Sequence, residues 1–224
     1  MSEAMRFSSK RGLFITFEGS EGCGKSTQIK RLASRLNRLG YRVRSAREPG
    51  STRVGERIRH LLKFSKSNGG MLPETELMLF SASRAQLVRE TILPALTRNE
   101  IILCDRFADS TTVYQGAARK LDLRFIEKLN SFVTSKRKPD LTLILDVDAD
   151  LGLKRAKQKT RTTDRMETQH RSFYKAVRHG FLQLAKREPR RVKVIDASLS
   201  LKETSEAIWA RVHPLISRFP QRKK

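Results

Sequence analysis

Residues 13–26 read LFITFEGSEGCGKS, a short apolar run followed by a glycine-rich loop that ends in Lys25 and Ser26. From Gly19 to Ser26 the spacing is G-x-x-x-x-G-K-[ST], the phosphate loop of nucleotide-binding proteins. Glycines let backbone N–H groups converge on phosphate oxygens, Lys25 reaches the outer phosphates, and the Ser26 hydroxyl is placed to bind Mg²⁺. The alternative is a surface turn that happens to contain glycines. We expect the triphosphate of ATP to be bound by Gly19, Ser20, Glu21, Gly22, Cys23, Gly24, Lys25, Ser26 and Thr27.

Helix-like and strand-like patterns alternate along the rest of the chain. Residues 28–39 carry apolar side chains at helical spacing, and Gly40 stands where a helix would end. Strand-like runs lie at 13–17, 41–46, 101–104, 141–147 and 192–195. This alternation predicts an α/β fold of three layers, in which a five-stranded parallel sheet is flanked by helices, as in P-loop NTPases.

The chain of 224 residues is long enough for one α/β domain and contains no Pro/Gly/Ser-rich linker. We expect a basic N-terminal extension at 1–12, a single domain at 13–217 and a basic tail at 218–224. No apolar stretch approaches the length of a membrane span, and the first residues lack the apolar block of a signal peptide. Two cysteines do not make a disulfide framework. We therefore expect a cytoplasmic protein with no membrane partner.

The net charge of +24 is large enough to raise the question of nucleic-acid binding. The basic residues are spread along the chain, and no aromatic platform is interleaved with them. We therefore do not expect nucleic acid as a specific partner. A nucleic-acid-stimulated ATPase stays as an alternative, because it would account for the charge more directly.

Charged residues stand where the predicted strands end, which is where ligands bind in parallel sheets. Asp105 ends an apolar run and is expected to hold Mg²⁺ together with Ser26. The alternative role for Asp105 is a helix N-cap. Arg47 closes the second strand and Arg106 follows the third, so the two guanidinium groups predict a second substrate that carries a phosphate. The alternative is a pair of surface ion pairs with neighbours such as Glu48.

Several separated motifs together resemble those of thymidylate kinases. They are the phosphate loop with an acidic residue at Glu21, the run REPG at 47–50, LFSASRAQ at 79–86, the series Asp105-Arg106, Ser110-Thr111 and Tyr114-Gln115-Gly116, and PDL at 139–141 leading to LDV at 145–147. The resemblance runs from about residue 13 to residue 198. It implies ATP-dependent phosphorylation of dTMP to dTDP in dTTP biosynthesis, with Mg²⁺ as cofactor, ATP and dTMP as partners and a homodimer as assembly.

The resemblance also implies a role for single residues. Phe80 would stack on the thymine ring, and Arg84 would hydrogen-bond its edge; the alternative for Phe80 is plain core packing. Tyr114 would crowd the 2′ position of the sugar. The implied dTMP site as a whole consists of Glu21, Arg47, Phe80, Arg84, Arg106, Ser110, Thr111, Tyr114 and Gln115.

Residues 154–167 are rich in Lys and Arg and resemble the mobile lid of these kinases. The family places a catalytic arginine in the phosphate loop or in the lid, and here the loop has none, so the resemblance implies that the lid supplies it. Arg155, Arg161 and Arg165 are equal candidates, and the alternative is a solvated basic loop. The implied catalytic set is Lys25, Arg47, Arg106, Arg155, Arg161 and Arg165. Two further rivals are another nucleoside monophosphate kinase and a deoxynucleoside kinase with Glu21 or Glu48 as base.

Overall fold

The computed structural model describes residues 12–64, 70–159, 170–217 and 219. Five strands form one sheet in the order β2-β3-β1-β4-β5, and every neighbouring pair is parallel. The strands are β1 (Leu13–Glu18), β2 (Val43–Arg47), β3 (Ile101–Asp105), β4 (Leu141–Asp146) and β5 (Val192–Asp196). The five-stranded parallel sheet expected from the sequence is therefore confirmed.

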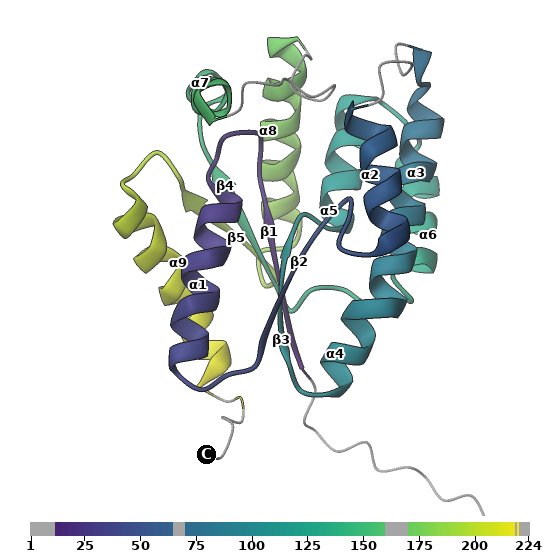
Figure 1. Ribbon diagram of the computed structural model, residues 1–224. Coiled ribbons are helices and arrows are strands. Elements are labelled where there is room, and N and C mark those ends of the chain that lie inside the picture. The colour runs from purple at the N-terminus through teal and green to yellow at the C-terminus, as the bar shows by residue number, and fades with distance from the viewer. Residues whose placement is uncertain (1–11, 65–69, 160–169, 218, 220–224) are drawn as a thin grey trace, which may run out of the picture.

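Helices cover both faces of this sheet (Figure 1). They are α1 (Lys25–Arg38), α2 (Arg53–Phe64), α3 (Pro73–Leu87), η2 (Val88–Ile92), α4 (Leu93–Thr97), α5 (Ala108–Thr111), η3 (Thr112–Ala118), α6 (Leu123–Val133), α7 (Ala149–Lys159), α8 (Arg171–Arg187) and α9 (Leu201–Ile216), of which η2 and η3 are π-helical. One face is covered by α1 and α9, and the other by the helices from α2 to α6 together with α8. No helix in the described ranges has both the length and the apolar character needed to cross a bilayer.

The central strand β1 shows why the sheet needs a layer of helices on each of its two faces. All six of its residues are buried. Because successive side chains of a strand point to opposite faces, Leu13, Ile15 and Phe17 pack in the cluster that includes α1 and α9, while Phe14 packs against η2 and α4. β1 lies between β3 and β4, so the loop that follows it emerges from the middle of the sheet, at the carboxyl ends of the strands.

The second strand differs from the expected one. β2 begins at Val43, whereas the alternating pattern predicted a strand from residue 41. Tyr41 is buried instead against α9, where its hydroxyl donates a 3.1 Å hydrogen bond to the carbonyl oxygen of Ile216. The helix predicted at 28–39 is confirmed, although α1 begins at Lys25 and ends at Arg38.

Candidate active site

The carboxyl ends of β1, β2 and β3 come together at one edge of the sheet (Figure 1). Arg47 is the last residue of β2 and lies opposite Asp105, the last residue of β3. Asp105 in turn lies opposite Phe17, two residues before the phosphate loop begins at Gly19. The sheet register therefore brings three of the predicted site segments to one place.

The phosphate loop is wound around the ammonium group of its own lysine. Lys25 is buried, and its Nζ donates to the carbonyl oxygens of Gly19 at 3.1 Å and Ser20 at 2.9 Å and to the Sγ of Cys23 at 3.3 Å. Gly24 has a φ of 89° and its carbonyl oxygen accepts from the N–H groups of residues 27 and 28, which starts α1. The left-handed backbone at this position favours glycine.

Ser26 and Asp105 form the candidate magnesium site. The Oγ of Ser26 donates to Oδ2 of Asp105 at 2.7 Å. A hydroxyl and a carboxylate are hard oxygen ligands, and Mg²⁺ is usually bound by one or two such groups together with substrate phosphates and water, so these residues fit the ion. The alternative of an N-cap at Asp105 is wrong, because α5 begins at Ala108 and its N-cap is Phe107.

Arg106 lies between the phosphate loop and the segment that follows β3. Its Nη1 donates to the Gly19 carbonyl oxygen at 2.9 Å, and its Nη2 donates to Oε1 of Glu21 at 2.8 Å. The guanidinium carbon is 4.9 Å from the centre of the Tyr114 ring. Burial opposes ionisation of Glu21, but the positive charges of Arg106, Lys25 and Lys63, together with the hydrogen bond from Arg106, outweigh it and lower the pKa of Glu21 to about 2. Glu21 is therefore a carboxylate at neutral pH.

Arg47 also forms an ion pair, but with the carboxylate of Glu56 and not with that of its neighbour Glu48. Its Nη2 donates to Oε1 and Oε2 of Glu56 at 2.9 and 2.8 Å, and both side chains are about half exposed. The neighbouring Glu48 is buried and turns away to Arg84. Both predicted phosphate-binding arginines thus contact an anionic side chain, as a guanidinium group also contacts a phosphate.

Arg84 and Phe80 lie one helical turn apart on α3. Arg84 is almost fully buried; its Nε donates to Oε2 of Glu48 at 2.7 Å, Nη1 to Oδ1 of Asn130 at 3.0 Å and Nη2 to the carbonyl oxygen of Phe107 at 3.1 Å. Phe80 is half-buried and belongs to none of the three hydrophobic clusters found in the described residues, which speaks against plain core packing.

The remaining predicted side chains project from α5 and η3. The Tyr114 hydroxyl donates to Oε1 of Glu21 at 3.4 Å, so Tyr114 lies against the same carboxylate as Arg106. Gln115 is buried, and its Nε2 donates to Oε1 of Glu76 at 2.7 Å. Ser110 and Thr111 are both buried.

Glu18 is a buried residue of this region that the sequence reasoning did not single out. It is the last residue of β1, and its carboxylate accepts from the backbone N–H of Phe107 at 2.8 Å and from Oγ of Ser110 at 2.6 Å. Burial, followed by the nearby Asp109 carboxylate, raises the pKa of Glu18 to about 8. A charged residue at the end of an apolar strand, directly before Gly19, was the available signal.

Glu76 and Asn130 were also missed, and no local pattern marks them. Their contacts with Gln115 and Arg84 join residues 39 and 46 positions apart in the chain, so only the folded structure shows them.

The predicted lid is described only in its first part, which belongs to α7. Arg155 donates from Nη1 to the Ala197 carbonyl oxygen at 2.6 Å and from Nη2 to the Ser198 carbonyl oxygen at 3.4 Å. Arg161 and Arg165 lie outside the described residues. α7 contacts the phosphate loop backbone to backbone, since a Cβ on Gly22 would collide with the carbonyl oxygen of Gly152.

Comparison with known proteins agrees with this geometry. Residues 17–208 match the family model described as Thymidylate kinase. The chain is 45% identical over 216 residues to a thymidylate kinase of Geobacter sulfurreducens, covering 94% of this chain and 100% of that protein. It is 46% identical over 202 residues to one of Deinococcus radiodurans, covering 90% and 97%. The solved structure of thymidylate kinase from Ehrlichia chaffeensis matches with a TM-score of 0.73 at 33% identity, covering 91% of this chain and 99% of that one. With the family model covering most of its length and relatives of this identity along almost the whole chain, the chain belongs to the thymidylate kinase family.

Proposed function

We propose that this chain transfers the γ-phosphoryl group of ATP to dTMP and so produces dTDP for the synthesis of dTTP. One contact carries the proposal: Nη1 of Arg106 donates to the carbonyl oxygen of Gly19 at 2.9 Å. An arginine suited to a phosphate acceptor thereby touches the loop that is suited to the phosphate donor. In-line transfer needs the two phosphate groups next to each other in this way.

The chemistry that these residues support is electrostatic. A nucleoside monophosphate has a second pKa of about 6 and is largely ionised at neutral pH, so its phosphate needs no general base. The main obstacle is repulsion between two anionic nucleotides. Lys25, Arg47, Arg106 and the lid arginines place positive charge around the phosphates. Mg²⁺, the proposed cofactor, would be held by Ser26 and Asp105 and would neutralise charge on the β- and γ-phosphate oxygens.

The acceptor base and sugar are assigned to the region where α3 and η3 face each other. Phe80 would stack on the thymine ring, Arg84 and Gln115 would bind its edge, and Ser110 and Thr111 would complete the site. Tyr114 lies against Glu21, which supports a position beside the 2′ and 3′ carbons of the sugar, where Tyr114 would crowd the 2′ position.

The electrostatics of Glu21 argue against a deoxynucleoside kinase. Such an enzyme needs a carboxylate base to accept the proton of a hydroxyl acceptor. The pKa of Glu21 is lowered to about 2, which makes it a poor base at neutral pH. The other candidate, Glu48, is engaged by Arg84 in a buried ion pair of 2.7 Å.

We assign residues 154–167 as the lid. α7 already reaches the loop after β5 through Arg155, and residues of this loop resemble those that pass the adenine of ATP. Closure of a lid over the nucleotides would exclude water, which otherwise accepts the phosphoryl group. Arg155, Arg161 and Arg165 are the candidate arginines for the transition state.

A panel of acceptors tests the proposal. ADP formation is followed by a coupled assay with ATP and Mg²⁺ and with dTMP, dUMP, dCMP, dAMP, dGMP or thymidine as acceptor. We expect the highest kcat/KM for dTMP and no turnover of thymidine. ATP hydrolysis stimulated by DNA, without formation of dTDP, would show that the proposal is wrong. Omission of Mg²⁺ with excess chelator is the control for metal dependence.

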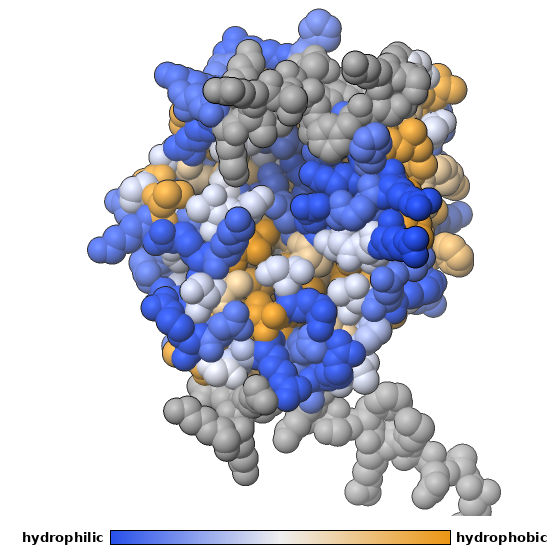
Figure 2. Space-filling model, in the orientation of Figure 1, coloured by the Kyte–Doolittle hydropathy of each residue, from blue (hydrophilic) through white to orange (hydrophobic). Residues whose placement is uncertain are grey.

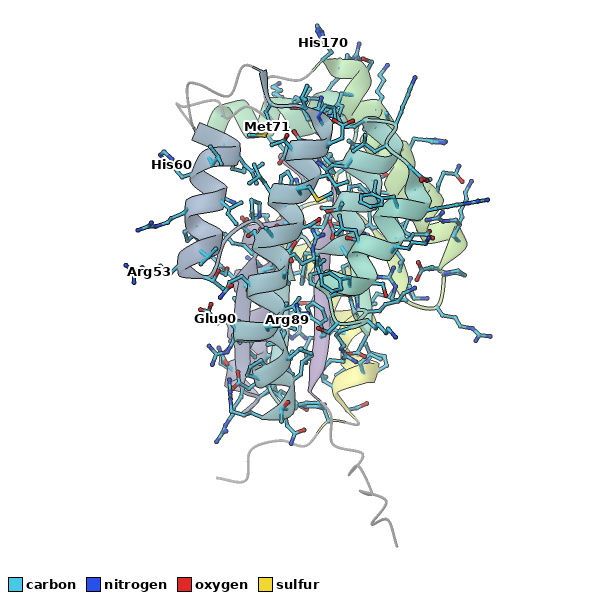
Figure 3. All side chains as sticks on the ribbon, turned by 90° about the vertical axis from the view of Figure 1, so that its right-hand side faces the viewer. Arg53, His60, Met71, Arg89, Glu90 and His170 are labelled. Carbon is cyan, nitrogen blue, oxygen red and sulfur yellow. The ribbon has the colours of Figure 1, made fainter. Side chains whose placement is uncertain are left out.

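A homodimer through α2, α3 and α6 is part of the proposal. Val54 and Leu61 on α2, and Phe125 and Phe132 on α6, are exposed in pairs seven residues apart, so each pair lies on one face of its helix. Figure 3 looks onto this side of the molecule, with Arg53 and His60 labelled on α2. The apolar residues Leu77, Leu79, Val88 and Ile92 of α3 and η2 are buried or half-buried and so could serve either the core or an interface.

Sedimentation velocity tests this assembly. We expect the mass of a dimer for the unchanged chain and of a monomer for Phe132→Glu. Leu215→Glu, an exposed residue of α9 on the other side of the sheet, is the control and is expected to stay dimeric (Figure 1).

We also assign the protein to the cytoplasm, since both of its cysteines are buried free thiols. Hydrophilic residues cover most of the surface seen in Figure 2, with apolar ones in smaller patches.

A further inference from the structure

The side-chain amide of Gln115 has one orientation, and Glu76 sets it. Nε2 of Gln115 donates to Oε1 of Glu76 at 2.7 Å, and the two side chains are only 2% and 1% exposed. A flipped amide would bring the Gln115 carbonyl oxygen against a carboxylate oxygen, two acceptors facing each other in a buried place. The flipped state is therefore strongly disfavoured.

The carboxylate of Glu76 is itself held in place. Its Oε2 accepts from Nη2 of Arg119 at 3.3 Å, and the guanidinium carbon of Arg119 lies 4.9 Å from the centre of the Phe173 ring. Arg119 therefore links Glu76 to α8. Glu76 is thus a fixed acceptor, to which only a donor group of Gln115 can turn.

Glu76, Phe80 and Arg84 follow one another at steps of four residues on α3. Residues with this spacing lie on one face of a helix, about 6 Å apart along its axis. Arg84, at one end of the row, is tied to Phe107 and to α6. At the other end Glu76 is tied to Gln115 of η3. The half-buried Phe80 therefore lies in this row between Arg84, which only donates, and Glu76, which engages an N–H group of the Gln115 amide.

We propose that Glu76 is a positioning residue that determines which base the site accepts. Because Glu76 takes up the Nε2 of Gln115, the Oε1 of Gln115 is left to face the base as an acceptor. Among the described residues, no group donates a hydrogen bond to this oxygen. The inference rests on the proposed function, because it takes the space next to Phe80 as the base site.

The chemistry of the pyrimidines decides the outcome. Thymine and uracil carry hydrogen on N3 and an acceptor oxygen at C4, so they offer a donor to Gln115 and an acceptor to Arg84. Cytosine has a lone pair on N3 and an amino group at C4, so it meets an acceptor with an acceptor and a donor with a donor. Glu76 therefore selects against dCMP. It does not separate dTMP from dUMP, because neither contact reads the 5-methyl group.

Glu76→Gln is the direct test. The new amide either donates or accepts, so Gln115 is no longer held in one orientation. We expect the ratio of kcat/KM for dTMP to kcat/KM for dCMP to fall at least about tenfold, the order expected for loss of one oriented buried hydrogen bond. The change is expected mainly in KM, with kcat for dTMP within about twofold. Glu74→Gln removes the same charge from an exposed position on the same helix and is expected to leave the ratio unchanged.

A second background shows whether Glu76 acts through Gln115. In Gln115→Ala protein, adding Glu76→Gln is expected to change the ratio no further, because the group that Glu76 orients is gone. An equal effect of Glu76→Gln with and without Gln115 would mean a merely structural role and would overturn the inference. Thermal unfolding of each variant shows that it is folded.

The two proposals fail in different ways. If the unchanged chain does not phosphorylate dTMP, the proposed function fails. If the chain phosphorylates dTMP but Glu76→Gln keeps the ratio of dTMP to dCMP, only the role of Glu76 is overturned. If Glu76→Gln does not fold, Glu76→Asp takes its place, since it keeps the charge beside Arg119 and withdraws the carboxylate by one methylene. An unchanged ratio in Glu76→Asp would likewise overturn the inference.

Discussion

Ser26 and Asp105 are joined by a hydrogen bond of 2.7 Å, although they are 79 positions apart in the chain. Ser26 is the second residue of α1, and Asp105 is the last residue of β3. The parallel register of β1 and β3 brings them together, because it aligns Phe17 with Asp105 and lets the phosphate loop turn over the end of β3. The sheet thereby brings together the two oxygen ligands of the proposed Mg²⁺ site.

Asp105→Asn is therefore expected to weaken the metal site. Loss of the carboxylate charge should raise the Mg²⁺ concentration needed for half-maximal activity by about 10- to 100-fold. The measurement is a titration of activity with Mg²⁺ at fixed ATP. Glu127→Gln, at an exposed position on α6, serves as the control. An unaltered Mg²⁺ dependence in Asp105→Asn would remove this residue from the metal site.

Arg106→Ala is expected to lose most dTMP phosphorylation. Removal of an arginine that stabilises the transferred phosphoryl group costs about a thousandfold in rate or more. Steady-state kinetics with dTMP give the loss, and thermal unfolding shows that the variant is folded. The matched control is Arg44→Ala, since Arg44 is a half-exposed residue that pairs with Glu100 at the amino ends of β2 and β3, away from the carboxyl ends that carry the candidate site. Near-normal turnover of Arg106→Ala would place it outside the site.

The proposed lid at residues 154–167 predicts a larger loss of kcat when an arginine is removed than when a lysine is removed. Arg161→Ala or Arg165→Ala should reduce kcat far more than Lys157→Ala or Lys159→Ala, because a guanidinium binds phosphate oxygens in two-point geometry. Rates at saturating ATP and dTMP make the comparison. Equal losses in all four variants would indicate diffuse positive charge with no specific catalytic arginine.

Removal of Arg155 is expected to affect KM for ATP more than kcat, in contrast to removal of Arg161 or Arg165. Its guanidinium donates to the carbonyl oxygens of Ala197 and Ser198, so Arg155→Ala should release α7 from the loop after β5. We expect a higher KM for ATP with a smaller loss of kcat. A loss of kcat as large as that of the most damaging lid variant would instead assign the catalytic arginine to this position.

Glu18 predicts a pH-dependent stability. Its pKa rises from the ordinary value of 4.5 to about 8 in the folded protein, so between these values the folded state keeps a proton that the unfolded state releases. The free energy of unfolding should therefore decrease with rising pH in this window, by at most about 1.4 kcal/mol per pH unit from this group. Below pH 4.5 both states are protonated and the contribution is complete.

Glu18→Gln removes this titration. Urea unfolding at several pH values from 5 to 8 is expected to show a smaller loss of stability for the variant than for the unchanged chain. Because all other titrating groups are common to both proteins, the difference between the two curves isolates Glu18. Parallel curves would show that Glu18 does not carry the raised pKa.

The strand Leu13–Glu18 and the loop after it illustrate what local sequence reveals. Burial of every residue in a central strand requires a continuous apolar run, and a phosphate loop requires glycine at left-handed positions such as Gly24. Both requirements act over a few neighbouring residues. Tyr41 shows the limit, since its alternation with Val43 predicted a strand, while contact with α9 placed it in the core.

The pairing of the charged side chains could not be predicted from local sequence. Arg47 pairs with Glu56, whereas Glu48 is buried with Arg84, and Glu76 meets Gln115 across two helices. Sequence by itself determined the α/β order, the phosphate loop and the strand ends at which charges gather, because those depend on side-chain periodicity and backbone conformation. Tertiary structure alone decided which charge meets which, because pairing depends on the segments that pack together and on how much water they exclude.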